Sequence, residues 1–88
     1  PENFSNDEFN LKDMGITIQN TIVKDHLKLN SKTDAQFKVY DLNSRLIDSY
    51  QFNNGQHSFD MSKLNAGNYF LVFVDQGGRK SYARIQKQ

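Results

Sequence analysis

Two histidines, His26 and His57, are the only side chains of this 88-residue sequence whose ordinary pKa allows proton transfer near neutral pH. Nucleophilic catalysis would require one of them within hydrogen-bond reach of a hydroxyl nucleophile, with a carboxylate to orient the ring. The two histidines fall in different predicted strands, and no serine or carboxylate is spaced around either as in a catalytic triad. We therefore expect no catalytic residues and no enzymatic activity.

Aspartates recur beside the predicted turns and are the candidate ligands for a calcium ion: Asp25, Asp34, Asp41, Asp60 and Asp75. No loop has the dense ligand spacing of a calcium site, and hydrogen bonds from each carboxylate to its own turn explain these residues better. The chain has no cysteine, which excludes a disulfide, a thiolate metal ligand and a thiol nucleophile. We expect neither a metal site nor a cofactor.

The chain is nearly neutral, with a formal net charge of +1. It therefore lacks a long-range field that would attract duplex nucleic acid or an anionic membrane, and no apolar run is long enough to insert into one. Cations gather late in the chain, at Arg79, Lys80, Arg84 and Lys87, around Tyr82. Such charges protect a sheet edge from intermolecular pairing or form a recognition surface for a receptor. They are too few to indicate a binder of single-stranded nucleic acid.

Apolar and polar residues alternate with a period of two, and no window keeps the spacing of an amphipathic helix. The alternation predicts about seven short strands, at residues 16–18, 26–29, 37–40, 45–52, 57–61, 69–75 and 80–86. This spacing is typical of an all-β, immunoglobulin-like antiparallel β-sandwich, and a small barrel is the alternative.

Segments outside these strands are assigned by their turn chemistry. Residues 20–25 are expected to form a connection, and the Asn54-Gly55 pair predicts a type I′ hairpin between the strands on either side of it. A chain of this length forms one domain. We expect a linker or irregular first strand over residues 1–13 and the sandwich over residues 14–88.

A polar corner followed by an apolar strand, residues 59–74, is the most distinctive stretch of the chain. Gly67 permits a sharp turn, and Tyr69 is expected to bury its ring and bond its hydroxyl to the backbone, as in the tyrosine corner of immunoglobulin-like sandwiches. One face of this segment should point into the core: Phe59, Met61, Leu64, Tyr69, Leu71 and Phe73.

The opposite face of the last strand in that stretch carries Phe70, Val72 and Val74, where a half-exposed strand would have polar residues. Either the domain itself covers this face, with Phe4, Phe9 or an aromatic of a neighbouring strand, or the face is a patch that binds a partner.

Motifs follow one another in a recognisable order along residues 16–88. Asn20 lies in the first turn, Val39-Tyr40-Asp41 ends a strand, and Ser44-Arg45 follows in the next turn. The polar corner and a basic ending, Arg84-Ile85-Gln86-Lys87-Gln88, complete the series.

This order resembles the type A C-terminal sorting domain of type IX secretion in Bacteroidota. That family has a Pro-Asn-Pro turn where this chain keeps only Asn20, and a Gly-Arg turn where Ser44 replaces the glycine. Its Asp-Leu-Ser-x-Leu-x-x-Gly-x-Tyr corner corresponds to residues 60–69, with Met61 in place of leucine.

The resemblance implies that this domain is a secretion signal attached to an N-terminal cargo domain. The cargo would reach the periplasm by its own signal, the outer-membrane translocon would recognise the folded domain, and a surface sortase would commonly remove it. Cleavage would fall in or before residues 1–15, and the cargo would be secreted or held at the cell surface.

The same resemblance assigns translocon recognition to a small group of residues: Gly67, Tyr69, Arg84, Lys87 and Gln88. Trimming residues 84–88 is expected to abolish export without unfolding the sandwich.

Two other functions fit a small β-sandwich of a secreted protein. A carbohydrate-binding or adhesive module would display an aromatic platform, for which Tyr40, Tyr50 and Tyr82 are the candidates. A structural spacer would need no binding surface.

Overall fold

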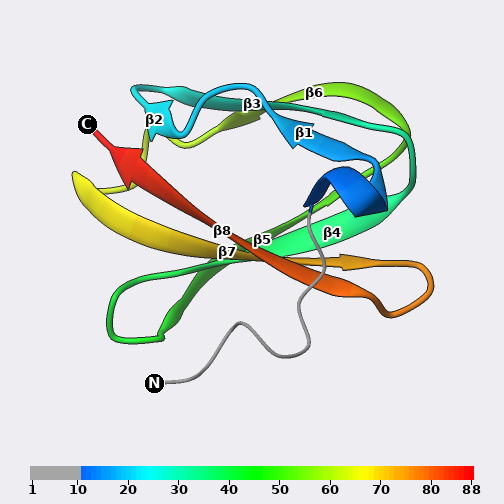
Figure 1. Ribbon diagram of the computed structural model, residues 1–88. Helices are drawn as coiled ribbons and strands as arrows, with labels where there is room; N and C mark the ends of the chain where they lie inside the picture. Colours follow the sequence, from blue (N-terminus) through cyan, green and yellow to red (C-terminus); the bar gives the residue numbers. More distant parts are fainter. Residues whose placement is uncertain (1–10) are drawn as a thin grey trace.

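A computed structural model describes residues 11–88 of the protein (Figure 1). It contains one short 3-10 helix and eight strands: η1 Leu11–Met14, β1 Ile16–Ile18, β2 Ile22–Val23, β3 His26–Ser31, β4 Ala35–Tyr40, β5 Leu46–Phe52, β6 Gly55–Asp60, β7 Gly67–Asp75 and β8 Lys80–Lys87. Within these residues no helix has the length and apolar character needed to cross a membrane.

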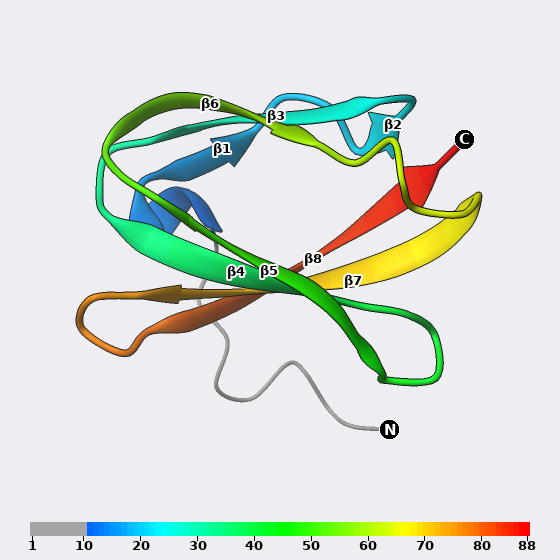
Figure 2. The same cartoon turned by 180° about the vertical axis from the view of Figure 1, so that it is seen from behind.

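The strands form two sheets that pack as the layers of a sandwich (Figures 1 and 2). One sheet has the order β1-β3-β6, and the other has the order β2-β8-β7-β4-β5. This confirms the all-β sandwich expected from the alternation. Neighbouring strands are antiparallel except for β2 and β8, which pair in parallel.

Strand β2 is the extra element, because residues 20–25 were expected to form only a connection. Ile22 pairs with Gln86 and Val23 pairs with Lys87. The amide of Gln86 donates to the Thr21 carbonyl at 2.8 Å, and the amide of Gln88 donates to the Val23 carbonyl at 2.9 Å. A bridge of two residues is too short to produce a visible alternation, so only the tertiary pairing reveals it.

The inward faces of both sheets supply one apolar core, and Phe37 on β4 lies in the middle of it with no exposed surface. Its ring centroid is 5.0 Å from those of Tyr50 and Phe73, and 5.1 Å from that of Phe59. Because Phe59 belongs to the three-stranded sheet and the others to the five-stranded sheet, this aromatic cluster joins the two layers.

The predicted hairpin at Asn54-Gly55 is wrong. Strand β5 pairs with β4, whereas β6 pairs with β3, so the chain crosses here from one sheet to the other. A type I′ turn needs positive φ at both central residues, and among the described non-glycine residues only Ser44 has one. Local turn chemistry was outweighed by the burial of the adjoining strands in different layers.

Two true hairpins of the five-stranded sheet, β4–β5 and β7–β8, close with the same turn. In the second, Asp75 accepts hydrogen bonds from the amides of Gly77 at 3.0 Å and Arg79 at 2.9 Å, and from Nε of Arg79 at 2.7 Å. Gly78 has φ of 86° at the tight point of that turn.

The first hairpin repeats this arrangement with a serine at the tight point. Asp41 accepts hydrogen bonds from the Asn43 amide at 2.8 Å, the Arg45 amide at 3.0 Å and Nε of Arg45 at 2.9 Å. Ser44 occupies the position of Gly78, with φ of 65°. The aspartates beside these turns therefore act as the sequence predicts, by bonding to their own loops.

Candidate recognition surface

The tyrosine corner forms as expected at the entrance of β7. The Tyr69 hydroxyl donates to the Asn65 carbonyl at 2.7 Å, and the side chain is 93% buried, with 7% of its surface exposed. Gly67, two residues earlier, is exposed and has φ of 146°, a conformation that side chains with a Cβ rarely adopt. These two residues set the path of the backbone and offer little side-chain surface of their own.

The residues of the basic ending differ in their exposure. Arg84 and Gln88 are exposed, whereas Ile85 and Lys87 are buried. Lys87 donates from Nζ to the main-chain oxygen of Gln88 at 2.9 Å. The ammonium group is therefore held against the end of its own strand.

Register places the predicted recognition residues on two adjacent strands. Gly67 lies opposite Lys87 and Tyr69 lies opposite Ile85, while Arg84 lies opposite Phe70. The structure thus brings Gly67, Tyr69 and Lys87 to the end of the sandwich that carries the chain terminus.

The last residues of β8 approach the three-stranded layer at this end of the sandwich (Figures 1 and 2). A groove of about 500 Å³ lies beside them. Its walls include Ile22, Lys24, His26, Lys28 and Gln88. Sequence reasoning missed this groove, because it depends on the two-residue pairing of β2 with β8.

Asn20 fixes the turn at the edge of that groove. Its side-chain amide donates to the His26 carbonyl at 2.9 Å, and its side-chain oxygen accepts from the Lys28 amide at 2.9 Å. The asparagine therefore ties the loop between β1 and β2 to strand β3.

The outer face of the five-stranded sheet carries the second predicted surface, Phe70, Val72 and Val74, and all three are half-buried. Cross-strand neighbours share a face of a sheet. On β8 these neighbours are Arg84, Tyr82 and Lys80, and on β4 they are Tyr40, Lys38 and Gln36. We call this set the outer face.

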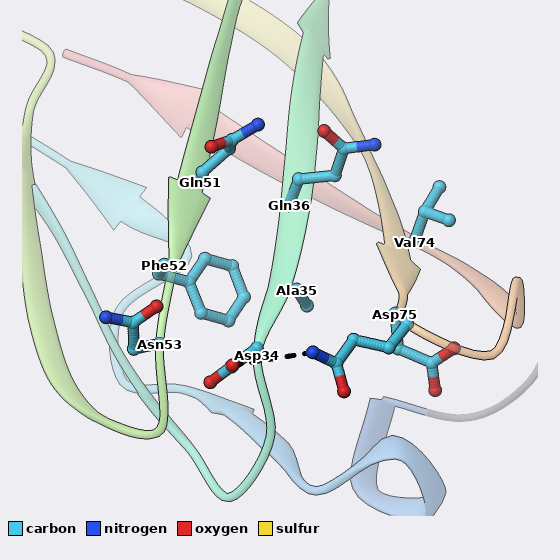
Figure 3. Close-up of a pocket in the computed structure, with 9 residues that line it drawn as sticks. Asp34, Ala35, Gln36, Gln51, Phe52, Asn53, Val74 and Asp75 are labelled. Carbon is cyan, nitrogen blue, oxygen red and sulfur yellow. Dashed lines mark hydrogen bonds between the residues drawn. The ribbon is translucent and has the colours of Figure 1, made fainter.

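One end of the outer face is hollowed by a shallow depression of about 340 Å³ between β4, β5 and β7 (Figure 3). Amide side chains predominate around it, with Gln36 and Gln51 on neighbouring strands and Val74 beside them. Asp34 closes its rim by accepting hydrogen bonds from the Asn54 amide at 3.1 Å and the Gln76 side chain at 3.5 Å.

The candidate catalytic histidines lie apart, and the candidate glycan-binding tyrosines are divided between two faces of the five-stranded sheet. His57 points inward, with its ring 5.6 Å from that of Phe52, whereas His26 is exposed on the outside of the same sheet. Tyr50 packs in the core against Phe37, away from Tyr40 and Tyr82 on the outer face. Among residues 11–88, no three histidine or acidic side chains gather as metal ligands.

Electrostatics mark Tyr50 as the most perturbed of these groups. Burial, reinforced by the nearby Asp48 carboxylate, raises the pKa of the Tyr50 hydroxyl to about 12. This hydroxyl also lies 3.5 Å from the Asp60 carbonyl, so the residue bridges the edges of the two sheets. The neutral phenol is therefore the form that this position favours.

Comparison with known proteins assigns the family. No curated protein matches the chain. A family model described as "Secretion system C-terminal sorting domain" matches residues 23–88. These residues contain the tyrosine corner, the basic ending and the two Asp-Arg hairpins, which are β4–β5 with its Asp41–Arg45 pair and β7–β8 with its Asp75–Arg79 pair. The chain therefore belongs to the C-terminal sorting domains of type IX secretion.

Proposed function

We propose that this domain is the C-terminal secretion signal of a longer cargo protein and has no catalytic role of its own. The cargo crosses the periplasm, the outer-membrane translocon recognises the folded sandwich, and the cargo emerges at the cell surface or in the medium. The family match over residues 23–88 carries this proposal. Membership of the family implies an interaction with the type IX secretion system, a cargo N-terminal to the domain, and secretion to the cell surface or exterior.

Exposure divides the proposed recognition residues into two roles. Arg84 and Gln88 are exposed and are proposed to contact the translocon directly. Tyr69 and Lys87 are buried, and Gly67 offers no side chain, so these three are proposed to act by shaping the strand ends that the translocon reads. Phe70, Val72 and Val74 are proposed as a further partner-facing patch.

Cleavage by a surface sortase is proposed to occur before Leu11. Met14 is 98% buried, with 2% of its surface exposed, and Leu11 packs against the core, so a protease would have to unfold η1 to cut within it. Residues 1–10 lie outside the described residues, and their polar sequence suits a protease site. The expected product is a cargo whose new C-terminus lies in or before this segment, identified by mass spectrometry of the surface-exposed protein.

A reporter fusion tests the proposed export. Residues 1–88 are joined to the C-terminus of a periplasmic reporter in a host with a working type IX system. We expect to find the reporter at the cell surface or in the medium. Its export to these places should require the translocon. A reporter that stays in the periplasm of the competent host, with the domain shown to be folded, would refute the proposal.

Substitutions in the same fusion test direct recognition. Arg84→Gln and Gln88→Ala should lower export several-fold while leaving the melting temperature of the domain unchanged, because both side chains are exposed. Lys63→Gln, an equal charge change on an exposed loop, is the matched control. Normal export of the Arg84→Gln and Gln88→Ala variants would remove these side chains from recognition.

A further inference from the structure

The groove beside the chain terminus, which we name the β2–β3 groove, has walls from both sheets. Ile22 belongs to the five-stranded sheet, whereas His26 and Lys28 belong to the three-stranded sheet. Gln88, one of the proposed recognition residues, also lines this groove. These walls meet only when the two layers are packed together, so a partner that binds the groove distinguishes the folded sandwich from an unfolded chain.

An exposed aliphatic side chain forms part of the groove wall. Strand β2 has only two residues, and neighbouring side chains of a strand point to opposite faces, so the inward position of Val23 turns Ile22 outward. Val23 has no exposed surface, whereas 55% of the Ile22 surface is exposed. The core is therefore filled by Val23, and Ile22 is available for contact with a partner.

Two lysines, Lys24 and Lys28, line the groove together with one aspartate, Asp25. Leaving His26 aside, the walls carry one surplus positive charge. All three charged side chains are exposed, and neither lysine forms an ion pair with a described residue. A carboxylate brought by a partner therefore meets a cation that is not already paired, which is the charge complementarity typical of specific interfaces.

Hydrogen bonds hold the walls of the groove in place. Asn20 donates to the His26 carbonyl and accepts from the Lys28 amide, each at 2.9 Å. The Gln88 amide donates to the Val23 carbonyl at 2.9 Å. Because this backbone is fixed before binding, little conformational entropy is lost when a partner docks.

We propose that the β2–β3 groove binds a segment of a protein partner that presents a carboxylate beside an aliphatic side chain. The aliphatic side chain packs on Ile22, and the carboxylate pairs with Lys24 or Lys28. The assignment of this segment to the type IX translocon rests on the proposed function, whereas the chemistry of the groove does not. Gln88 contacts the same partner, so the recognition surface extends from the basic ending to strand β3.

A peptide titration of residues 1–88 tests the chemistry of the groove without secretion. The probe is acetyl-Glu-Leu-Glu-Leu-Glu-amide, and the control is the same peptide with glutamine in place of glutamate. Nuclear magnetic resonance follows the backbone amides of the domain. We expect saturable shifts at residues 20–28 and at Gln88 with the acidic probe only. Binding should weaken at 1 M salt, where the screening length falls to about 3 Å.

Charge reversal in the groove checks where the probe binds. The double variant Lys24→Glu, Lys28→Glu should lose the shifts, because the pairing cations are replaced by carboxylates. The matched control Lys12→Glu, Lys63→Glu reverses two exposed lysines outside the groove and should keep them. Shifts centred on another face, equal binding of the neutral peptide, or equal effects of the two double variants would overturn the proposal.

The reporter fusion tests whether the translocon uses the groove. Ile22→Gln and the variant Lys24→Glu, Lys28→Glu should lower export several-fold and leave the melting temperature unchanged, because these side chains are exposed. Ile47→Gln, at another exposed isoleucine of the five-stranded sheet, should be exported normally.

The outcomes separate the groove from the proposed function. Normal export of both groove variants beside an exported natural domain would remove the groove from recognition and leave the proposed function intact. If the natural domain itself stays in the periplasm, the proposed function fails, and the peptide titration decides whether the groove binds an acidic, aliphatic segment.

Discussion

At the scale of single residues, the two Asp-Arg hairpins show how the chain uses its charged side chains. Each aspartate bonds to the amides and the arginine of its own turn, and each turn has one residue with positive φ. Ser44 therefore adopts its positive φ at some conformational cost, because glycine, as at Gly78, adopts positive φ without steric strain.

Ser44→Gly should stabilise the domain by about 0.5–1 kcal/mol, since the relief of strain at φ of 65° exceeds the added flexibility of the unfolded chain. Urea unfolding at neutral pH measures the change in the free energy of unfolding. Gly78→Ser in the equivalent turn is the reverse substitution and should destabilise by a similar amount. An unchanged or lower stability of Ser44→Gly would show that the serine makes a compensating contact.

Asp75 should make stability depend on pH. Burial raises the pKa of this carboxyl, but the hydrogen bonds from Arg79 and Gly77 and the charge of Arg79 outweigh it, so the pKa lies below its ordinary value. A depressed pKa contributes stability above the unfolded pKa of about 3.9, and the contribution is lost as the pH falls through the folded value. Stability of the natural protein should therefore fall more steeply from pH 4 toward pH 2 than that of Asp75→Asn.

Thermal unfolding followed by circular dichroism at a series of pH values measures this difference. Asp41→Asn is the matched control, because Asp41 makes the same bonds and its pKa is also lowered, first of all by the Arg45 amide. Its side chain is 17% exposed against 3% for Asp75, and water screens the more exposed pair. A pH effect as large for Asp41 as for Asp75 would show that water does not weaken the more exposed Asp41–Arg45 pair.

At the scale of elements, β8 joins recognition and folding in one strand. Ile85 is 1% exposed in the core, and Gln86 and Lys87 pair with both β7 and β2. Trimming residues 84–88 would thus remove core and sheet together, so we expect the trimmed sandwich to be strongly destabilised, contrary to the expectation from the sequence. Single substitutions of Arg84 and Gln88 separate the two roles.

Ile85→Ala should cost about 2–5 kcal/mol, because a buried methyl-rich side chain is replaced by a cavity. Ile47→Ala, at an isoleucine that is 42% exposed on β5, should change the stability by less than about 0.5 kcal/mol. Denaturant unfolding of both variants measures the two free energies. Equal losses would mean that β8 is not anchored in the core as the register indicates.

At the scale of the whole molecule, the aromatic cluster around Phe37 holds the two sheets together. It draws Tyr50 and Phe73 from one sheet and Phe59 from the other. A domain without disulfides depends on such packing for its entire stability.

Phe37→Ala should cost about 3–5 kcal/mol. Small domains have a total stability of about 5–15 kcal/mol, so this single change should bring the melting temperature close to physiological temperature or abolish folding. Phe37→Leu keeps much of the volume and should lose less. Calorimetry of the three proteins checks the order, and a small loss for Phe37→Ala would mean that the sheets are joined elsewhere.

The sequence by itself determined the strands that bury one face, the tyrosine corner and the motif order that indicates the family. These features depend on residue type and local spacing. Apolar residues at every second position of a strand face the core. The Tyr69 hydroxyl bonds to the carbonyl of Asn65, only four residues earlier in the chain. Alternation also located the outer face, because Phe70, Val72 and Val74 stand on the side opposite the buried residues of β7.

Only the tertiary structure decided how the strands are distributed between layers. The parallel pairing of β2 with the chain end, the crossing at Asn54-Gly55 and the burial of Lys87 all depend on residues far apart in the sequence. Local propensity cannot rank such arrangements, because their free energy comes from surface that two distant segments bury against each other. The same reason explains why the basic ending could be recognised in the sequence, while its division into displayed and buried side chains could not.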